Sequence, residues 1–121
     1  MDVAVRKAGE VRVIEVVGKI LGGPESQALR DAIDVVFEQG SERLLIDLTH
    51  VPWVNSAGLG ILLAAYSRMR DRGGEMRFCG VGQRVRGILK TTKLLTVMPC
   101  DADERSAIQK FEDAHPGGLS S

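Results

Sequence analysis

Histidine, cysteine and aromatic side chains are scarce in this chain of 121 residues, which has two histidines, two cysteines and 4% aromatic residues. His50 and His115 are not at the spacing of metal ligands, so the sequence offers no set of side chains for a zinc site. Cys79 and Cys100 occur without an export signal, and we expect them to pack as small apolar side chains rather than to form a disulfide.

The chain has no excess of positive or negative charge, because 16 lysines and arginines balance 16 aspartates and glutamates. This balance argues against nucleic acid as a partner. The middle of the chain has a basic bias, which we expect to be a solvated helix surface (Arg68, Arg70, Arg72, Arg84, Arg86 and Lys90). No apolar run approaches the length of a membrane span and the amino terminus lacks a signal-peptide pattern, so we expect a cytoplasmic protein without membrane insertion.

The size of the chain suits one small domain, since 44% hydrophobic residues can build a single core and no second apolar block is present. We place this domain at residues 1–112 and expect residues 113–121, with Pro116-Gly117-Gly118, to be a disordered tail. The sequence does not indicate the oligomeric state.

Apolar periodicity predicts strands that alternate with helices. Strands are expected at 3–6, 11–17, 44–48, 76–80 and, shorter, 96–98; helices are expected from Pro24 to Gly40 and at 57–72, 83–91 and 103–111. Asp101 or Asp103 can cap the last helix. The pattern predicts an α/β fold: a mixed, partly parallel sheet of four to five strands with about four helices.

The most informative stretch runs from Trp53 to Gly60, between the buried strand at 44–48 and the amphipathic helix that follows. Ser56 is expected at or next to the helix N-cap, where a hydroxyl can accept a free backbone N–H. Glycine inside a helix lowers stability by about 0.5–1 kcal/mol relative to alanine. Some other interaction should therefore offset this loss at the start of the helix, where Ala57, Gly58 and Gly60 leave the backbone uncovered. Either this helix packs closely on the sheet, or a partner or phosphate approaches its amino terminus. Of these two alternatives, we expect that Gly58 is needed for the close approach of a partner to the helix backbone.

The order of the strand at 44–48, Val51 to Val54 and then Asn55-Ser56-Ala57-Gly58-Leu59-Gly60 resembles the STAS domain of bacterial anti-sigma factor antagonists. The similarity extends over about residues 11–111. It implies that Ser56 is the phospho-acceptor, and that a partner binds at residues 55–60 together with Lys19 and Leu21 of the segment 18–23.

Two positions depart from the family pattern. Asn55 occupies the usual position of an aspartate, and the segment 18–23 lacks an acidic residue that is often found there. Asparagine keeps the ability to accept hydrogen bonds and to form the turn, but it cannot act as a base. We therefore expect phosphorylation of Ser56 to persist at a reduced rate.

Patterns for catalysis and cofactor binding are missing. Val54 stands where a nucleophile elbow needs glycine, and Leu63 stands where a dinucleotide fingerprint needs its third glycine. We expect no enzymatic activity, cofactor or metal. The resemblance favours an anti-sigma factor antagonist that binds an anti-sigma factor (a serine kinase), releases a sigma factor and is switched by serine phosphorylation. The alternatives are a STAS interaction module of a lipid-transport or stress-signalling assembly, and a small-ligand or nucleotide-binding domain.

Overall fold

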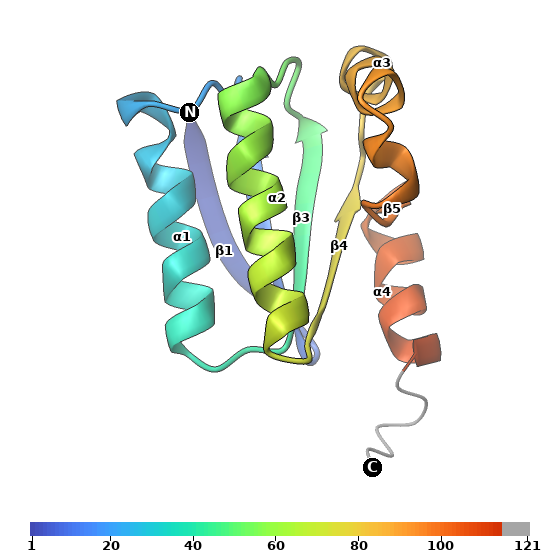
Figure 1. Cartoon of the computed structure of the whole chain (residues 1–121). Helices are drawn as coiled ribbons and strands as arrows, with labels where there is room; N and C mark the ends of the chain where they lie inside the picture. The colour runs from blue at the N-terminus through green and yellow to red at the C-terminus, as the bar shows by residue number, and fades with distance from the viewer. Residues whose placement is uncertain (115–121) are drawn as a thin grey trace.

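The computed structural model describes residues 1–114, which form one five-stranded sheet with helices on both faces (Figure 1). The strands are β1 (Asp2–Ala8), β2 (Val11–Val17), β3 (Arg43–His50), β4 (Glu75–Cys79) and β5 (Cys100–Asp101). The α-helices are α1 (Gln27–Glu38), α2 (Ser56–Asp71), α3 (Gln83–Thr91) and α4 (Glu104–Ala114), and two 3-10 turns are η1 (Pro24–Ser26) and η2 (Leu94–Thr96). The predicted α/β class and mixed sheet are confirmed.

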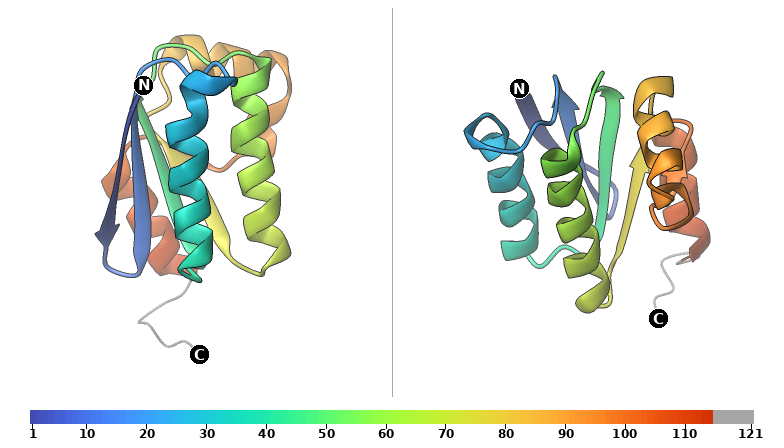
Figure 2. Two further views of the ribbon diagram at one scale, coloured as in Figure 1. Left: turned by 90° about the vertical axis from the view of Figure 1, so that its left-hand side faces the viewer. Right: turned by 45° about the horizontal axis from the view of Figure 1, so that its top comes forward.

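The order of the strands across the sheet is their order in the sequence, β1-β2-β3-β4-β5. β1 pairs antiparallel with β2 through the turn at Gly9, and each later pair is parallel. Three successive crossovers therefore move across the sheet in one direction. Because parallel crossovers are right-handed, α1, α2 and α3 must cover the same face. The chain passes to the opposite face only with α4, after the last strand (Figure 2).

The core has two parts, one on each face of the sheet. The larger part lies under α1, α2 and α3, and it includes five apolar residues of α1 that recur at the period of a helix (Leu29, Ala32, Ile33, Val36 and Phe37). The smaller part lies under α4, where Ala107 and Phe111 contact Val13, Leu45 and Cys79. The strand β3 contributes to both parts, as expected for a strand buried on both faces.

The structure corrects the predicted ends of several elements. The strand expected at 96–98 is wrong: η2 occupies Leu94–Thr96, and the last strand is the two-residue β5 at Cys100–Asp101. Lys93 there has a positive φ of 63°, and the apolar run after it closes a 3-10 turn instead of extending. The first helix begins as the 3-10 turn η1 at Pro24 and becomes α-helical only at Gln27.

The carboxyl-terminal helix also differs from expectation. It continues to Ala114, so residues 113 and 114 are helical and not part of a tail, whereas residues 115–121 lie outside the described part of the chain. Asp103 caps α4 by accepting a hydrogen bond from the backbone N–H of Ser106 at 2.8 Å. Asp101, the other predicted cap, instead accepts hydrogen bonds from Arg77 at 2.7 and 3.2 Å, and these bonds raise the pKa of the Arg77 guanidinium.

Candidate functional site

Two loops at the carboxyl ends of β2 and β3 lie side by side and form the candidate site (Figure 1). The backbone N–H of Ile20 donates to the Trp53 carbonyl at 3.0 Å, and the N–H of Asn55 donates back to the Ile20 carbonyl at 3.2 Å. Ile20 and Val54 are buried and form a parallel bridge. The start of α2 is therefore fixed on the sheet by backbone hydrogen bonds before any side chain contributes.

Asn55 is the N-cap of α2. Its side-chain Oδ1 accepts the backbone N–H of Gly58 at 2.8 Å, and its carbonyl accepts the first helical bond from Leu59. Ser56 is the first helical residue and its side chain is exposed. The prediction that Ser56 lies at or next to the cap is confirmed. The capping function belongs to Asn55, and the exposed Ser56 side chain is accessible for modification.

Gly58 is needed inside the protein rather than at a partner surface. A Cβ atom there would lie 2.0 Å from the Ile20 carbonyl oxygen and 2.9 Å from its Cγ2, far inside contact distance. The expectation that glycine at this position serves the approach of a partner is therefore corrected: it serves close packing of α2 on the loop after β2. Leu59 is also buried, in the larger part of the core.

The other predicted partner-binding residues are at least partly accessible. Lys19, Ala57 and Gly60 are exposed, and Leu21 is half-buried. Ala57 and Gly60 also line a groove of about 390 Å³ between α1 and α2, together with Ala64 and charged residues that include Arg30 and Arg68. The accessible part of the site is thus a surface of small side chains that begins at Ser56.

Sequence reasoning missed the support that holds the loop after β2. The Ser26 hydroxyl is buried and accepts the backbone N–H of Gly22 at 3.0 Å. Gly22 has a positive φ of 74°, and a Cβ atom there would lie 2.5 Å from the Cβ of Ala57. The pair Gly22-Gly23 before Pro24 was the available signal, since adjacent glycines before a helix indicate backbone that side chains cannot accommodate.

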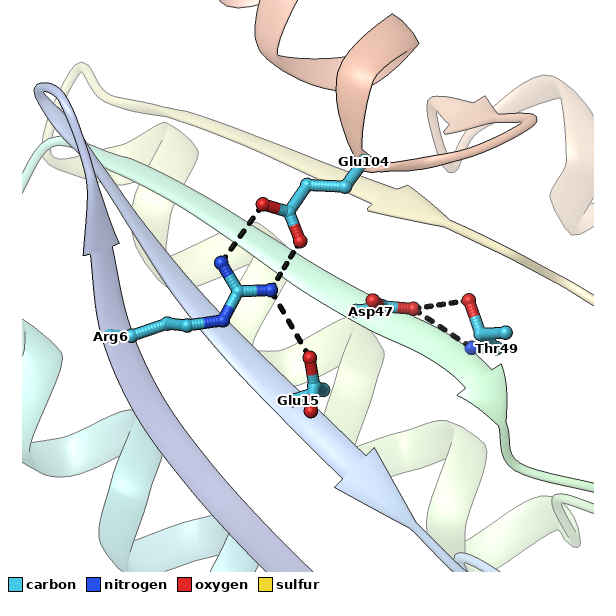
Figure 3. Close-up of polar contacts among 5 residues, drawn as sticks. All are labelled: Arg6, Glu15, Asp47, Thr49 and Glu104. Atoms are coloured by element: carbon cyan, nitrogen blue, oxygen red, sulfur yellow. Dashed lines mark hydrogen bonds and ion pairs between the residues drawn. The ribbon is translucent and has the colours of Figure 1, made fainter.

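A group of three carboxylates lies on the opposite face of the sheet, where Glu15, Asp47 and Glu104 have oxygens within 4.8 Å of one another (Figure 3). The Arg6 guanidinium donates to both Glu15 and Glu104, which raises the pKa of Arg6. Asp47 accepts the backbone N–H and the hydroxyl of Thr49 at 2.9 and 2.6 Å. Each of the three carboxylates thus accepts hydrogen bonds from donors of the protein itself. The ion pairs of Arg6 with Glu15 and Glu104 join β1, β2 and α4.

The two cysteines are free, with Cys79 fully buried and Cys100 partly buried. Burial, reinforced by the nearby Asp47 carboxylate, raises the pKa of Cys79 to about 12. Burial also raises the pKa of Cys100. Cys79 belongs to the smaller part of the core and Cys100 packs against the larger part, which confirms the expectation that they pack as small apolar side chains.

Residues 2–107 match the family model of the STAS domain, and the chain belongs to this family. It is 31% identical over 71 residues to the anti-sigma F factor antagonist of Paenibacillus polymyxa, an alignment that covers 59% of this chain and 61% of that protein. The chain therefore spans less than two thirds of that relative. It is 24% identical over 108 residues to the anti-sigma-B factor antagonist of Bacillus subtilis, which covers 89% of each protein.

Solved structures give the same fold. An anti-sigma factor antagonist from Mycobacterium paratuberculosis superposes with a TM-score of 0.79 at 27% identity, over 90% of this chain and 92% of that one. The phosphorylated form of SpoIIAA from Bacillus superposes with a TM-score of 0.71 at 18% identity, over 91% of this chain and 99% of that one, and at this identity shows the fold alone.

No helix within residues 1–114 combines the length and the apolar character that crossing a lipid bilayer requires.

Proposed function

We propose that this protein is an anti-sigma factor antagonist: it binds an anti-sigma factor, a serine kinase, and so releases a sigma factor. The observation that carries the proposal is the exposed Ser56 at the first position of α2, in a chain whose curated relatives are anti-sigma factor antagonists. The docking surface consists of Ser56, Ala57 and Gly60 with the adjacent Lys19 and Leu21, while the buried Gly58 and Leu59 support it from inside.

Phosphorylation of Ser56 is the proposed switch. A phosphate adds about 1.5–2 negative charges and three acceptor oxygens. At the first position of a helix this charge faces free N–H groups and the positive end of the helix dipole, so the fold tolerates it. A partner surface that loses its water on docking does not, and an uncompensated charge there costs about 2–5 kcal/mol of binding free energy. This cost switches binding off without unfolding the domain.

The test is a binding screen with each anti-sigma factor encoded in the source genome, purified and titrated with the wild-type chain in a calorimeter. Ser56→Asp should bind at least about tenfold more weakly than wild type, equivalent to about 1.4 kcal/mol, whereas Ser56→Ala should bind as wild type does. The thermal midpoint of both variants should stay close to that of wild type. A chain that binds none of these anti-sigma factors is not an antagonist of this class.

Phosphorylation is tested separately, because Asn55 replaces the aspartate of the family pattern. Wild type and Asn55→Asp are incubated with the anti-sigma factor that binds and with ATP, and Ser56 phosphate is followed by intact-mass spectrometry. We expect phosphate on both proteins, at a lower rate on wild type, because asparagine caps the helix but supplies no carboxylate beside the hydroxyl. Phosphate only on Asn55→Asp would make binding by the natural chain independent of this modification.

A further inference from the structure

Trp53, the single tryptophan of the chain, is left 37% exposed three residues before Ser56. Its neighbour Val54 and the nearby Val51 are buried, and its carbonyl accepts the N–H of Ile20 at 3.0 Å. The backbone that carries the indole is therefore held in place while the ring remains partly in water. A large aromatic side chain in this position suits an interface, since tryptophan is enriched among the residues that dominate binding energy.

Arg84 at the start of α3 accompanies this tryptophan. Its Cζ lies 5.6 Å from the centroid of the Trp53 ring, a cation–π arrangement between two elements far apart in the sequence. Arg84 also lines a cleft of about 430 Å³ between residues 49–52 and the first residues of α3, with His50 and Gln83 on its walls. The surface next to Ser56 thus continues across Trp53 and Arg84 into a cleft.

Charge is distributed unevenly along the segments of the sequence that include Trp53 and Arg84. Residues 80–99 contain four cations (Arg84, Arg86, Lys90 and Lys93) and no aspartate or glutamate. Residues 49–67 contain no lysine, arginine, aspartate or glutamate. The segment 18–23 adds the exposed Lys19. Among the described residues that line the cleft, Arg84 is the one lysine, arginine, aspartate or glutamate, so the side-chain charge at the cleft is positive and a complementary partner surface is acidic.

We propose that Trp53 and Arg84 form a second docking point for the anti-sigma factor, which presents an acidic surface with an apolar recess for the indole ring. This inference rests on the proposed function, because it assigns the chemistry of the partner at the same site. It also gives the sign of the switch: a phosphate on Ser56 adds negative charge opposite an acidic partner, so repulsion across the interface separates the proteins.

The experiment uses the anti-sigma factor that binds wild type in the screen above. Its affinity is measured for Trp53→Ala and Arg84→Glu, and for two matched controls on other surfaces, Val35→Ala on α1 and Lys110→Glu on α4, both at exposed positions. Each test variant should bind at least about tenfold more weakly, and each control within about twofold of wild type. Fluorescence of the single tryptophan should change on binding in wild type and both controls.

Ionic strength supplies a second measurement. The association rate of wild type should fall as salt is raised from about 0.05 M to about 0.5 M, because screening weakens attraction between opposite charges. The fall should be smaller for Arg84→Glu and unchanged for Lys110→Glu. Arg84→Gln and Trp53→Phe, which keep most of the side-chain volume, replace any test variant whose thermal midpoint drops.

The outcomes separate this inference from the proposed function. If wild type binds no anti-sigma factor, the proposed function fails. If wild type binds while Trp53→Ala and Arg84→Glu keep full affinity, only the second docking point is overturned. A loss of self-association of the chain in Trp53→Ala, with unchanged affinity for the anti-sigma factor, would assign this surface to a second copy and would equally overturn it.

Discussion

At the scale of single residues, two glycines in the first two turns of α2 have opposite surroundings. Gly58 lies against the Ile20 carbonyl, where an added Cβ atom would be 2.0 Å from the oxygen, whereas an added Cβ at Gly60 meets nothing within 4 Å. The sequence shows both as glycines of one motif. Only the position of the neighbouring loop distinguishes the residue needed for packing from the residue that leaves the surface open.

This difference predicts opposite effects of the same substitution. Gly58→Ala should lower the free energy of unfolding by about 1–3 kcal/mol, because an extra methyl group forces the backbone of the Ile20 loop to move. Gly60→Ala should raise it by about 0.5–1 kcal/mol, since alanine is the better helix former. Urea denaturation measures both. Equal effects of the two substitutions would contradict the packing described for Gly58.

The buried thiol of Cys79 gives a prediction for pH. Its pKa is raised to about 12 in the folded protein, against an ordinary value of 9.0, so the folded state holds this proton more tightly than the unfolded state. The contribution to stability is fully present below about pH 9 and is lost as the pH rises toward 12. At pH 8, iodoacetamide should leave Cys79 unmodified in the native protein and should alkylate it in urea. Rapid native alkylation would indicate that the thiol is exposed.

At the scale of elements, helix ends were harder to derive than helix faces. The repeat of apolar residues along α1 coincides with its buried positions, because a 3.6-residue period places these residues on one face of the helix. The strand expected at 96–98 was wrong because a short apolar run fits a strand and a 3-10 turn equally well. The left-handed backbone at Lys93 decides between them, and lysine gives no warning of it.

The N-cap residue Asn55 fixes the start of α2, where the proposed phosphorylation site Ser56 lies. Asn55→Ala should lower the free energy of unfolding by about 0.5–2 kcal/mol, because the N–H of Gly58 loses its acceptor. Asn55→Asp should preserve or slightly raise stability, since a carboxylate accepts the same bond and interacts favourably with the helix dipole. Thermal unfolding of the three proteins checks the order. A stable Asn55→Ala variant would show that water replaces the cap.

The candidate site could be predicted only in part, because the sequence pattern shows where elements begin and not how two loops meet. The position of Ser56 at the helix start followed from the boundary between a buried strand and an amphipathic helix. The contacts of Ile20 and Gly22 with residues at the start of α2 did not, because they join residues about 35 positions apart and depend on how two loops meet. Trp53 and Arg84 are likewise brought together by the fold alone.

At the scale of the whole molecule, the smaller part of the core and the candidate site lie on opposite faces of the sheet. The candidate site belongs to the loops and helices of one face, and within residues 1–114 it is α4 that covers the other face, where Phe111 is fully buried. Phe111→Ala should therefore lower the free energy of unfolding by about 3–5 kcal/mol while the folded fraction binds the anti-sigma factor with unchanged affinity. Phe111→Leu, a milder change of volume, is the control and should cost less than about 1.5 kcal/mol.

Urea denaturation and calorimetry on the same samples make this comparison. Affinity that falls in parallel with stability, after correction for the unfolded fraction, would show that α4 and the Ser56 surface are coupled.

The sheet whose strands lie in sequence order also has a consequence for how the protein forms. Each strand pairs with the strand synthesised just before it, so every pairing closes only the intervening turn or helix. The entropy lost in closing a loop grows only slowly with its length, so each pairing adds a limited cost. The β1–β2 hairpin can form first, and each later strand adds to an existing edge. A nascent chain can thus build the Ser56 surface before α4 has left the ribosome.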